Sequence, residues 1–355
     1  NSCNFYFYCI ASGLDWNNMS SLGYDKKISI EKIMEVAAEF GLGEGTGVEL
    51  YEPITPLASA ERKMQGMKQS LWSYLYYNSD KYWPSATIKD DEKLREEIST
   101  ITSWMEENPD RGEIINRIKT QTTVRESKVE KITDDCKYSY FNQAQWTTGD
   151  EFNIAIGQGD NAYTPLQMAN YVATLGNDGK RNQVSLIKGI EGEGNNKKEK
   201  AYEIDVEKED LDKVIEGMKM VAKRGTLASC FSRFPVDVAG KTGTAERSGY
   251  INPKNEVVYV KSNLGRIAPG ISWEKVQKTM TKLMKDDPQK YPTENDTVDD
   301  ALIQASEKKV SYSDINQYKD TYDHFAWTIA MAPADNPKIA VVTLLIQGGT
   351  SYNAA

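Results

Sequence analysis

Apolar residues in several segments of this chain recur every three or four positions, the spacing of one helix face. Residues 30–40 follow this pattern after Ser29, whose side chain is expected to cap the helix. Residues 205–224 follow it too, with acidic residues first, basic residues last and Gly225 as the stop. The aromatic-rich stretch 5–16 is expected to form a buried helix.

Other segments are short, apolar and rich in β-branched residues, which is typical of strands. We expect strands at 236–247, 256–261, 325–332 and 338–346, and the last two are joined by the turn sequence 334–337 (ADNP). Helices followed by an antiparallel meander predict an α+β fold, with an antiparallel sheet flanked by helices.

Two long stretches differ from the rest in composition. Residues 54–146 and 263–321 are charged and helical in pattern, and they read as helical insertions into the fold. The chain is therefore divided into 1–53, 54–146, 147–262, 263–321 and 322–355, of which the first, third and fifth form one discontinuous domain. The aromatic segment 71–77 (LWSYLYY) is predicted to be the core of the first insertion, with a partner surface as the alternative.

Charge and hydropathy narrow the function classes. The 355 residues carry a formal charge of -9 and the sequence pI is near 5.0, which argues against a nucleic-acid partner. No apolar run reaches the ~20 residues that a bilayer-spanning helix needs. The chain opens on Asn1 without an initiator methionine, so we expect targeting elements to lie outside it.

Cysteine usage gives little sign of cross-linking or of a zinc ribbon. The four cysteines are scattered and contain no C-x-x-C pair (Cys3, Cys9, Cys136, Cys230). We expect them to be free, buried thiols.

The segment 239–246 (AGKTGTAE) is the most unusual in composition. A Gly-Lys-Thr triplet suggests a phosphate-binding loop, but that motif needs a glycine at position 235, where this chain has Pro235. The residues before the triplet alternate like a strand, so the nucleotide interpretation is weak.

The same segment resembles a motif of penicillin-recognising serine enzymes. Lys241-Thr242-Gly243 fits their K-T-G motif, and Ser2-Cys3-Asn4 fits S-x-N. The segments 156–159 (IGQG) and 164–169 (TPLQMA) resemble the GQG and TPLQ-A segments of class B penicillin-binding proteins.

Further matches follow the family's order. Residues 46–50 (TGVEL) resemble a T-G-I-x-L segment, 325–333 resemble a strand ending in Ala-Pro, and Gly348-Gly349 match a glycine pair. The resemblance covers 1–50, 148–260 and 322–355. It implies the transpeptidase fold shared with serine β-lactamases, incomplete at both ends in this chain.

The resemblance also implies an activity and its residues. A peptidoglycan D,D-transpeptidase transfers an acyl group from a D-Ala-D-Ala stem peptide through a serine ester. Lys241, Thr242 and Thr244 would hold the carboxylate of the stem peptide or of a β-lactam, and Gly243 would let the substrate backbone lie against the strand. The N–H of Thr244 would be an oxyanion donor.

Two further roles fall at the start of the chain. By the same resemblance Ser2 would relay protons and Asn4 would hold the acyl amide, although a helix cap is the structural alternative for both. The nucleophilic serine of an S-x-x-K motif should precede Ser2, and we expect it on a portion not in this chain. The S-x-x-K patterns that do occur fail on order (Ser29/Lys32, Ser185/Lys188, Ser272/Lys275, Ser306/Lys309).

The resemblance implies partners and a location as well. The partners would be stem peptides, β-lactam antibiotics, a membrane glycan polymerase and the N-terminal part of the same protein. The protein would be a single-pass membrane protein with this domain outside the cell. A serine β-lactamase or a β-lactam sensor of the same fold is the alternative.

The chemistry of the family needs no cofactor. His324 is the only histidine and follows Asp323. With a nearby cysteine these two residues could bind zinc, whereas a hydrogen-bonded strand histidine is the plainer interpretation.

Overall fold

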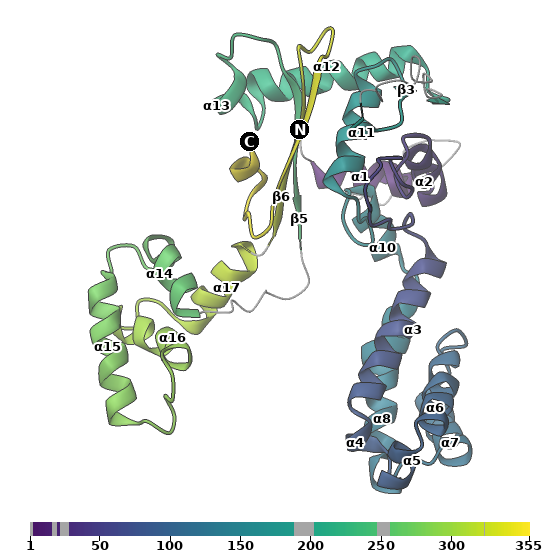
Figure 1. The fold of residues 1–355 in the computed structure, drawn as a ribbon, viewed down its shortest axis with the longest axis vertical. Helices are drawn as coiled ribbons and strands as arrows, with labels where there is room; N and C mark the ends of the chain where they lie inside the picture. The colour runs from purple at the N-terminus through teal and green to yellow at the C-terminus, as the bar shows by residue number, and fades with distance from the viewer. Residues whose placement is uncertain (1–2, 16–19, 22–27, 188–201, 247–255, 323) are drawn as a thin grey trace. The chain divides into compact units, whose positions relative to one another are not determined.

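A computed structural model of the chain describes residues 3–15, 20–21, 28–187, 202–246, 256–322 and 324–355. The chain divides into two compact units, Ser2–Thr164 and Pro165–Ala355, and each is described by itself. Together the described residues form an α+β structure with small antiparallel sheets, as the sequence predicts (Figure 1).

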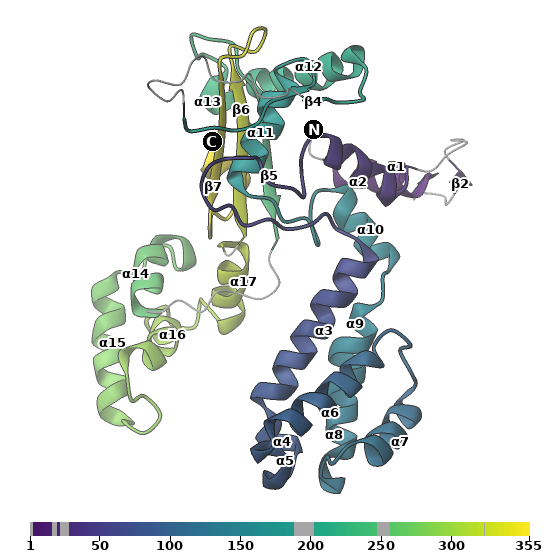
Figure 2. The ribbon, with the colours of Figure 1, turned by 45° about the vertical axis from the view of Figure 1, so that its right-hand side comes forward.

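The Pro165–Ala355 unit contains a three-stranded antiparallel sheet in the order β5-β6-β7. Its strands are β5 (Ala239–Ala245), β6 (Phe325–Ala332) and β7 (Ile339–Leu345), which confirms the strands predicted near these positions. Neighbouring strands in the sheet pair along their whole length (Figure 2). Because β6 is central, β5 lies at an edge of the sheet.

Helices cover the sheet on both faces. The helix α11 (Pro165–Leu175) packs on one face, where a Cβ on the next residue, Gly176, would come 2.8 Å from the sulfur of Met331. The opposite face is covered by the turn η3 (Ser351–Ala354) and by the segment that joins α12 (Lys208–Arg224) to α13 (Ala228–Phe231) (Figure 1). A short strand pair, β3 (Lys180–Arg181) with β4 (Tyr202–Glu203), completes this part.

Four helices follow β5, and they form their own core. They are α14 (Glu256–Ile267), α15 (Trp273–Asp286), α16 (Glu294–Ala305) and α17 (Tyr312–Tyr322). Buried aliphatic side chains from all four pack together, among them Val260, Val276, Val298 and Ile315.

The strand predicted at 256–261 is wrong, because these residues begin helix α14. The β-branched run EVVYV suggested a strand, but Val260, Leu264 and Ile267 are buried at helical spacing in the core just described. The carboxylate of Glu256 also binds the ammonium of the buried Lys319 on α17. Tertiary packing thus overrides the local strand preference.

The Ser2–Thr164 unit begins with two helices that pack on a third. They are α1 (Asn4–Ser12), α2 (Ile30–Glu39) and α10 (Thr148–Ala155). Ser29 caps α2 as predicted, since its hydroxyl accepts the N–H of Lys32 at 3.3 Å. The strand pair β1 (Leu14–Asp15) and β2 (Ser20–Ser21) follows α1.

The expectation of a buried aromatic helix at 5–16 is only partly met. The helix α1 exists, but it buries Cys9 and Ala11, while the side chains of Phe5, Tyr6 and Phe7 are exposed. The aromatic character of the stretch therefore does not report burial in this unit.

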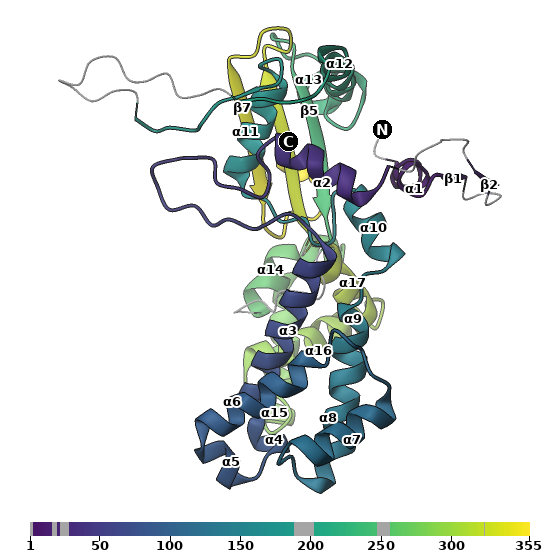
Figure 3. The same cartoon turned by 90° about the vertical axis from the view of Figure 1, so that its right-hand side faces the viewer.

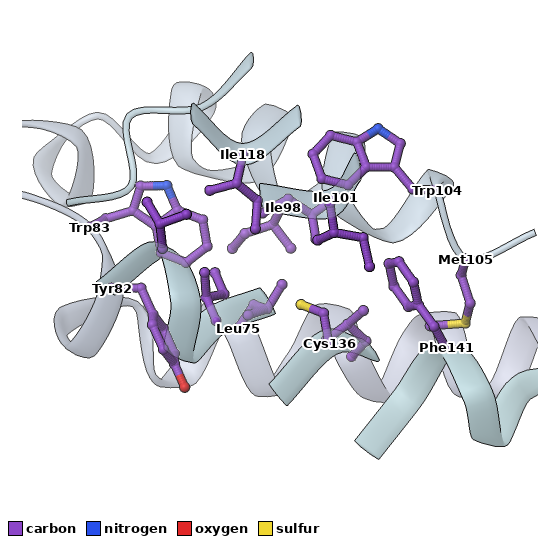
Figure 4. Close-up of a cluster of buried hydrophobic side chains, with 14 of the residues drawn as sticks. Leu75, Tyr82, Trp83, Ile98, Ile101, Trp104, Met105, Ile118, Cys136 and Phe141 are labelled. Atoms are coloured by element: carbon purple, nitrogen blue, oxygen red, sulfur yellow. The ribbon is translucent and has the colours of Figure 1, made fainter. Parts of the chain in front are cut away.

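The remaining helices of this unit form a bundle in the stretch predicted to be helical, and their α3, α6 and α8 helices lie near one another (Figure 3). Their bounds are α3 (Ala60–Tyr77), α4 (Ser79–Tyr82), α5 (Ser85–Lys89), α6 (Asp91–Ser103), α7 (Arg111–Gln121), η1 (Glu126–Lys128), α8 (Val129–Cys136), η2 (Lys137–Phe141) and α9 (Asn142–Ala144). Leu75, Ile98, Ile101, Cys136 and Phe141 point toward one another between them (Figure 4). These residues give the stretch its own hydrophobic core.

Two findings concern the cysteines and the membrane. All four cysteines are free, but only Cys9 and Cys136 are buried, whereas Cys3 and Cys230 are exposed, so the expectation of buried thiols is wrong for these two. Within the described ranges, no helix has the length and apolar character needed to cross a bilayer.

Candidate active site

The K-T-G residues lie on the edge strand β5, in extended backbone. Lys241 pairs with Ile329 of β6, Thr242 with Thr328 and Thr244 with Ala326. A phosphate-binding loop would instead open a helix at the lysine. The strand geometry rules out the nucleotide interpretation of this segment.

Side chains on β5 alternate between the two faces of the sheet. Thr242 and Thr244 therefore share one face, and Lys241 and Gly243 share the other. The two hydroxyls therefore lie on the opposite face of β5 from the ammonium. A chain that lay along the free edge of β5 would find groups on either side of it.

The hydroxyl of Thr242 is held by Thr226, a residue outside the motifs of the sequence. The Oγ1 atoms of Thr226 and Thr242 are 2.9 Å apart, and Thr242 is only 5% exposed. Thr226 lies between α12 and α13, beside the fully buried Leu227. A Cβ on Gly240 would come 2.8 Å from Leu227 Cδ1, so the glycine lets this segment dock closely on β5. In the sequence, the only sign of this contact is the Gly225-Thr226 pair, which directly follows a predicted helix.

The hydroxyl of Thr244 accepts a hydrogen bond from the backbone N–H of Ser351 at 3.0 Å. A hydroxyl has one proton and two lone pairs, so accepting this bond leaves its own proton for another acceptor. The Oγ1 of Thr328 is 3.5 Å from the carbonyl oxygen of Ser351, on the same face. The turn at Ser351 thus fixes the oxygen of Thr244 while its proton can still be donated.

Lys241 is half-buried, and its Nζ donates to the carbonyl of Thr242 at 2.6 Å. Burial lowers the pKa of Lys241 below the usual lysine value of 10.5, because desolvation disfavours the charged form. Gly243 is exposed, and a Cβ built there would meet nothing closer than Trp327 Cβ at 3.6 Å. The fold itself leaves room at this position, and the open surface suits a ligand backbone.

In the other unit, one carboxylate ties together two of the family-like segments. Glu52 Oε2 accepts from the backbone N–H of Thr46 at 2.7 Å and from its hydroxyl at 2.9 Å. Glu52 Oε1 accepts from the hydroxyl of Thr164 at 3.4 Å. In the sequence, the only sign of this role is a carboxylate six residues after Thr46. Glu52 therefore connects 46–50 with the start of 164–169.

The loop that contains Gly157 and Gly159 closes helix α10. Both glycines have positive φ, 78° and 67°, a conformation that favours glycine. The N–H of Gln158 donates to Asn153 O at 2.7 Å, and Asn161 Nδ2 donates to Gln158 O at 2.9 Å. The glycine spacing of the GQG segment thus has a backbone reason.

The S-x-N residues are described only in part. Ser2 lies outside the described residues. Asn4 is the first residue of α1, with an exposed side chain, and Cys3 is in the N-cap position without a side-chain cap. Asn4 and Lys241 lie in different units, so their common cleft stays a prediction.

The structure gives no support for a zinc site. His324 lies directly before β6, its carbonyl accepts the N–H of Gly348 at 2.9 Å, and its Nδ1 is buried with no partner among the described residues. Asp323 lies outside those residues. In the ranges that the structure describes, no three His, Cys, Asp or Glu side chains gather as a metal would require.

The described residues thus place a lysine and two hydrogen-bonded threonine hydroxyls on one edge strand of an α+β fold. Residues 58–266, more than half of the chain, match the sequence model of the family described as "Penicillin binding protein transpeptidase domain". The chain belongs to this family.

Individual relatives agree with the family. The chain is 37% identical to Penicillin-binding protein H of Bacillus subtilis (strain 168) over 113 residues, 29% of this chain and 16% of that protein. It is 29% identical to the Peptidoglycan D,D-transpeptidase MrdA of Haemophilus influenzae over 224 residues, 59% of this chain and 25% of that protein. The matched regions thus span a quarter or less of these relatives.

Two solved structures resemble this one more distantly. Pseudomonas aeruginosa PBP2 in complex with WCK 5153 gives a TM-score of 0.48 at 16% identity, over 98% of this chain and 43% of that one. Helicobacter pylori PBP2 in complex with MreC gives 0.45 at 18% identity, over 99% of this chain and 36% of that one.

Proposed function

We propose that the full protein is a serine D,D-transpeptidase that cross-links peptidoglycan stem peptides and is acylated by β-lactams. The observation that carries this proposal is the pair of hydroxyls on β5. The hydroxyl of Thr242 is hydrogen-bonded to the hydroxyl of Thr226, and that of Thr244 accepts from the backbone N–H of Ser351, on an edge strand beside Lys241. Such a set suits the terminal carboxylate of a stem peptide, which accepts strong hydrogen bonds from oriented donors.

The reaction proceeds by two acyl transfers. The nucleophilic serine attacks the carbonyl of the penultimate D-Ala, the terminal D-Ala leaves as the amine, and a serine ester forms. The amine of a second stem peptide then attacks the ester, which releases the serine and forms the cross-link. In this scheme Ser2 relays the proton to the leaving amine, Asn4 holds the acyl amide, and the N–H of Thr244 stabilises the oxyanion.

The serine that forms the ester belongs to an S-x-x-K motif upstream of Ser2. Every S-x-x-K pattern within these residues follows the S-x-N motif, in the wrong order for this family. We therefore expect the isolated 1–355 polypeptide to resist labelling by fluorescent penicillin, whereas the full protein is labelled. Stoichiometric labelling of the isolated polypeptide would place the nucleophile among these residues and contradict this part of the proposal.

The rate of deacylation tests the activity against its alternatives. A transpeptidase forms a long-lived penicilloyl ester and transfers stem peptides to an amine acceptor. A serine β-lactamase would hydrolyse the ester quickly, and a sensor would keep the ester without transferring any peptide. Cross-linked product from two stem peptides, measured with the full protein, identifies the transpeptidase, and the rate of deacylation separates the other two.

Location and partners follow from this activity. Peptidoglycan is assembled outside the cell membrane, so we place this domain there, anchored by a segment outside the chain. Cross-linking needs newly made glycan strands, and we propose a membrane glycan polymerase as partner. No metal is needed for either acyl transfer.

A further inference from the structure

A groove lined mainly by residues with polar side chains follows one face of helix α3, in the bundle of the Ser2–Thr164 unit. It has a volume of about 720 Å³, and its lining includes Arg62, Gln65, Gly66, Gln69 and Trp72. From position 62 to 65 or 66, then to 69 and to 72, the spacing is three or four residues, so these residues form one stripe on the helix, away from the buried Leu71 and Leu75. Thr102 at the end of α6 lies in the lining as well.

The indole of Trp72 is fixed in place before any ligand binds. Its ring is stacked on Tyr76, with centroids 5.0 Å apart and planes inclined by 14°. The guanidinium of Arg95 lies 5.4 Å from the centroid of the Trp72 ring, and Trp72 Nε1 donates to Ser99 Oγ at 3.3 Å. A side chain that is already ordered loses little entropy on binding, so Trp72 can serve as a rigid apolar platform.

Gly66 opens the centre of the groove. It lies inside helix α3, where glycine costs about 0.5–1 kcal/mol relative to alanine. A Cβ built there would meet no atom within 4 Å. Packing within the described chain therefore gives no reason for this glycine, whereas a ligand that lies close to the helix backbone would.

The charge of the groove is positive, in a chain whose net charge is -9. None of the described residues that line it is acidic. Arg62 Nη1 donates to main-chain carbonyls, that of Asp160 at 2.9 Å among them, and in the described part of the chain no carboxylate forms an ion pair with it. Lys68 pairs with Glu106, whose side chain is largely exposed. The guanidinium of Arg62 thus has its charge available for an anion.

We propose that this groove binds a glycan strand of peptidoglycan, an N-acetylated saccharide that carries acidic substituents. The amides of Gln65 and Gln69 suit hydroxyl and acetamido groups, and the indole of Trp72 suits the apolar face of a sugar ring. The guanidinium of Arg62 suits the acidic substituents of the strand. The inference rests on the proposed function, and it assigns the helical bundle to holding the strand whose peptides are cross-linked.

Binding is measured by NMR on the full protein, from the indole N–H signals, with Trp72→Phe identifying the signal of Trp72. The probes are an N-acetylglucosaminyl-N-acetylmuramyl-peptide, the same stem peptide without sugar, and neutral chitotetraose. The saccharide-peptide is expected to shift the Trp72 signal, chitotetraose to bind several-fold more weakly, and the bare peptide to leave the signal unchanged. Loss of affinity in added salt is expected for the acidic probe alone.

The matched variants are Gly66→Gln and Gly265→Gln. Both glycines are exposed, lie inside helices and have open space at Cβ, but only Gly66 lines the groove. Gly66→Gln is expected to weaken binding of the saccharide-peptide by about tenfold or more, equivalent to ~1.4 kcal/mol. Gly265→Gln is expected to bind like the parent, and neither variant should lose helical content.

Three results would overturn the inference: equal binding by Gly66→Gln and the parent, equal shifts from the bare peptide, or no binding by the saccharide-peptide. The proposed function is judged separately, from acylation of the full protein by fluorescent penicillin, which Gly265→Gln should leave unchanged. If the parent is acylated but the groove does not bind, the groove inference fails alone. If the parent is not acylated, the proposed function fails instead.

Discussion

The hydroxyl oxygens of Thr226 and Thr242 lie 2.9 Å apart and join the segment after α12 to the edge strand β5. The hydrogen bond between these two hydroxyls fixes the orientation of both side chains. Thr226 is therefore a positioning residue for Thr242, if Thr242 binds the substrate carboxylate.

Thr226→Val is expected to slow acylation of the full protein by benzylpenicillin. A net hydrogen bond between neutral groups is worth about 0.5–1.5 kcal/mol, so the second-order acylation rate constant should fall by about two- to tenfold. Thr226→Ser keeps the hydroxyl and should restore the rate. Stopped-flow or gel-based acylation kinetics measure this change.

The methyl ester of the same penicillin provides the control for Thr226, because it lacks the anionic carboxylate. If Thr226 acts only through binding of the carboxylate by Thr242, this ester should acylate the valine variant at nearly the parent rate. An equal loss with both compounds would mean that Thr226 only supports the local fold.

Removing the hydroxyl of Thr242 or of Thr244 should lower the acylation rate constant further than Thr226→Val does. A hydrogen bond to a charged group is worth about 1.5–3 kcal/mol, so Thr242→Val or Thr244→Val should lower the acylation rate constant by about ten- to a hundredfold. Thr343→Val is the matched control, because Thr343 is a strand threonine on β7, opposite Thr328. Parent-like acylation by both dock variants would show that the carboxylate binds elsewhere.

The acylation rate should decline at alkaline pH, and the midpoint of this decline should lie below the pKa of an exposed lysine. Burial lowers the pKa of Lys241 below 10.5, and loss of its proton removes the positive charge from the dock. Lys241→Arg keeps the charge at high pH, so the alkaline decline should move upward in this variant. An unchanged pH profile in Lys241→Arg would exclude Lys241 as the titrating group.

The same shift predicts the sign of a stability effect. Between the lowered pKa of Lys241 in the folded state and 10.5, the unfolded chain binds more protons, so stability from this group rises with pH. At lower pH the full penalty of burying the ammonium is present. Lys241→Met should therefore gain most over the parent near neutral pH, and the gain should shrink as pH approaches 10.5, as measured by urea unfolding.

Thiol labelling should separate the four cysteines into two classes. Cys3 and Cys230 are exposed and should react quickly with a thiol reagent. Burial raises the pKa of the Cys136 thiol, and Cys9 is also buried, so both should react only on unfolding. Mass spectrometry of labelled peptides measures the order, and early labelling of Cys136 would show that the bundle core opens.

Strand prediction succeeded where the segment lies in a regular sheet and failed at 256–261. Residues 325–332 and 338–346 are β-branched runs bounded by turn residues, and they form β6 and β7. The run 256–260 has the same local character, but its apolar residues continue into Leu264 and Ile267, which helices α15 to α17 bury. Whether such a run forms a strand or a helix therefore depends on the residues that pack against it, and these lie far along the chain.

The order and spacing of short motifs determined the family and the edge-strand position of Lys241, Thr242 and Thr244. These motifs can be read locally. A strand is indicated by side chains that alternate between two faces, and a glycine marks a position where the backbone must stay open. The hydrogen-bond partners of Thr242 and Thr244 could not be predicted from these motifs. Thr226 reaches Thr242 and Ser351 reaches Thr244 across 16 and 107 residues. Only the packing of α12 and of the turn η3 against the sheet brings these groups within hydrogen-bond distance.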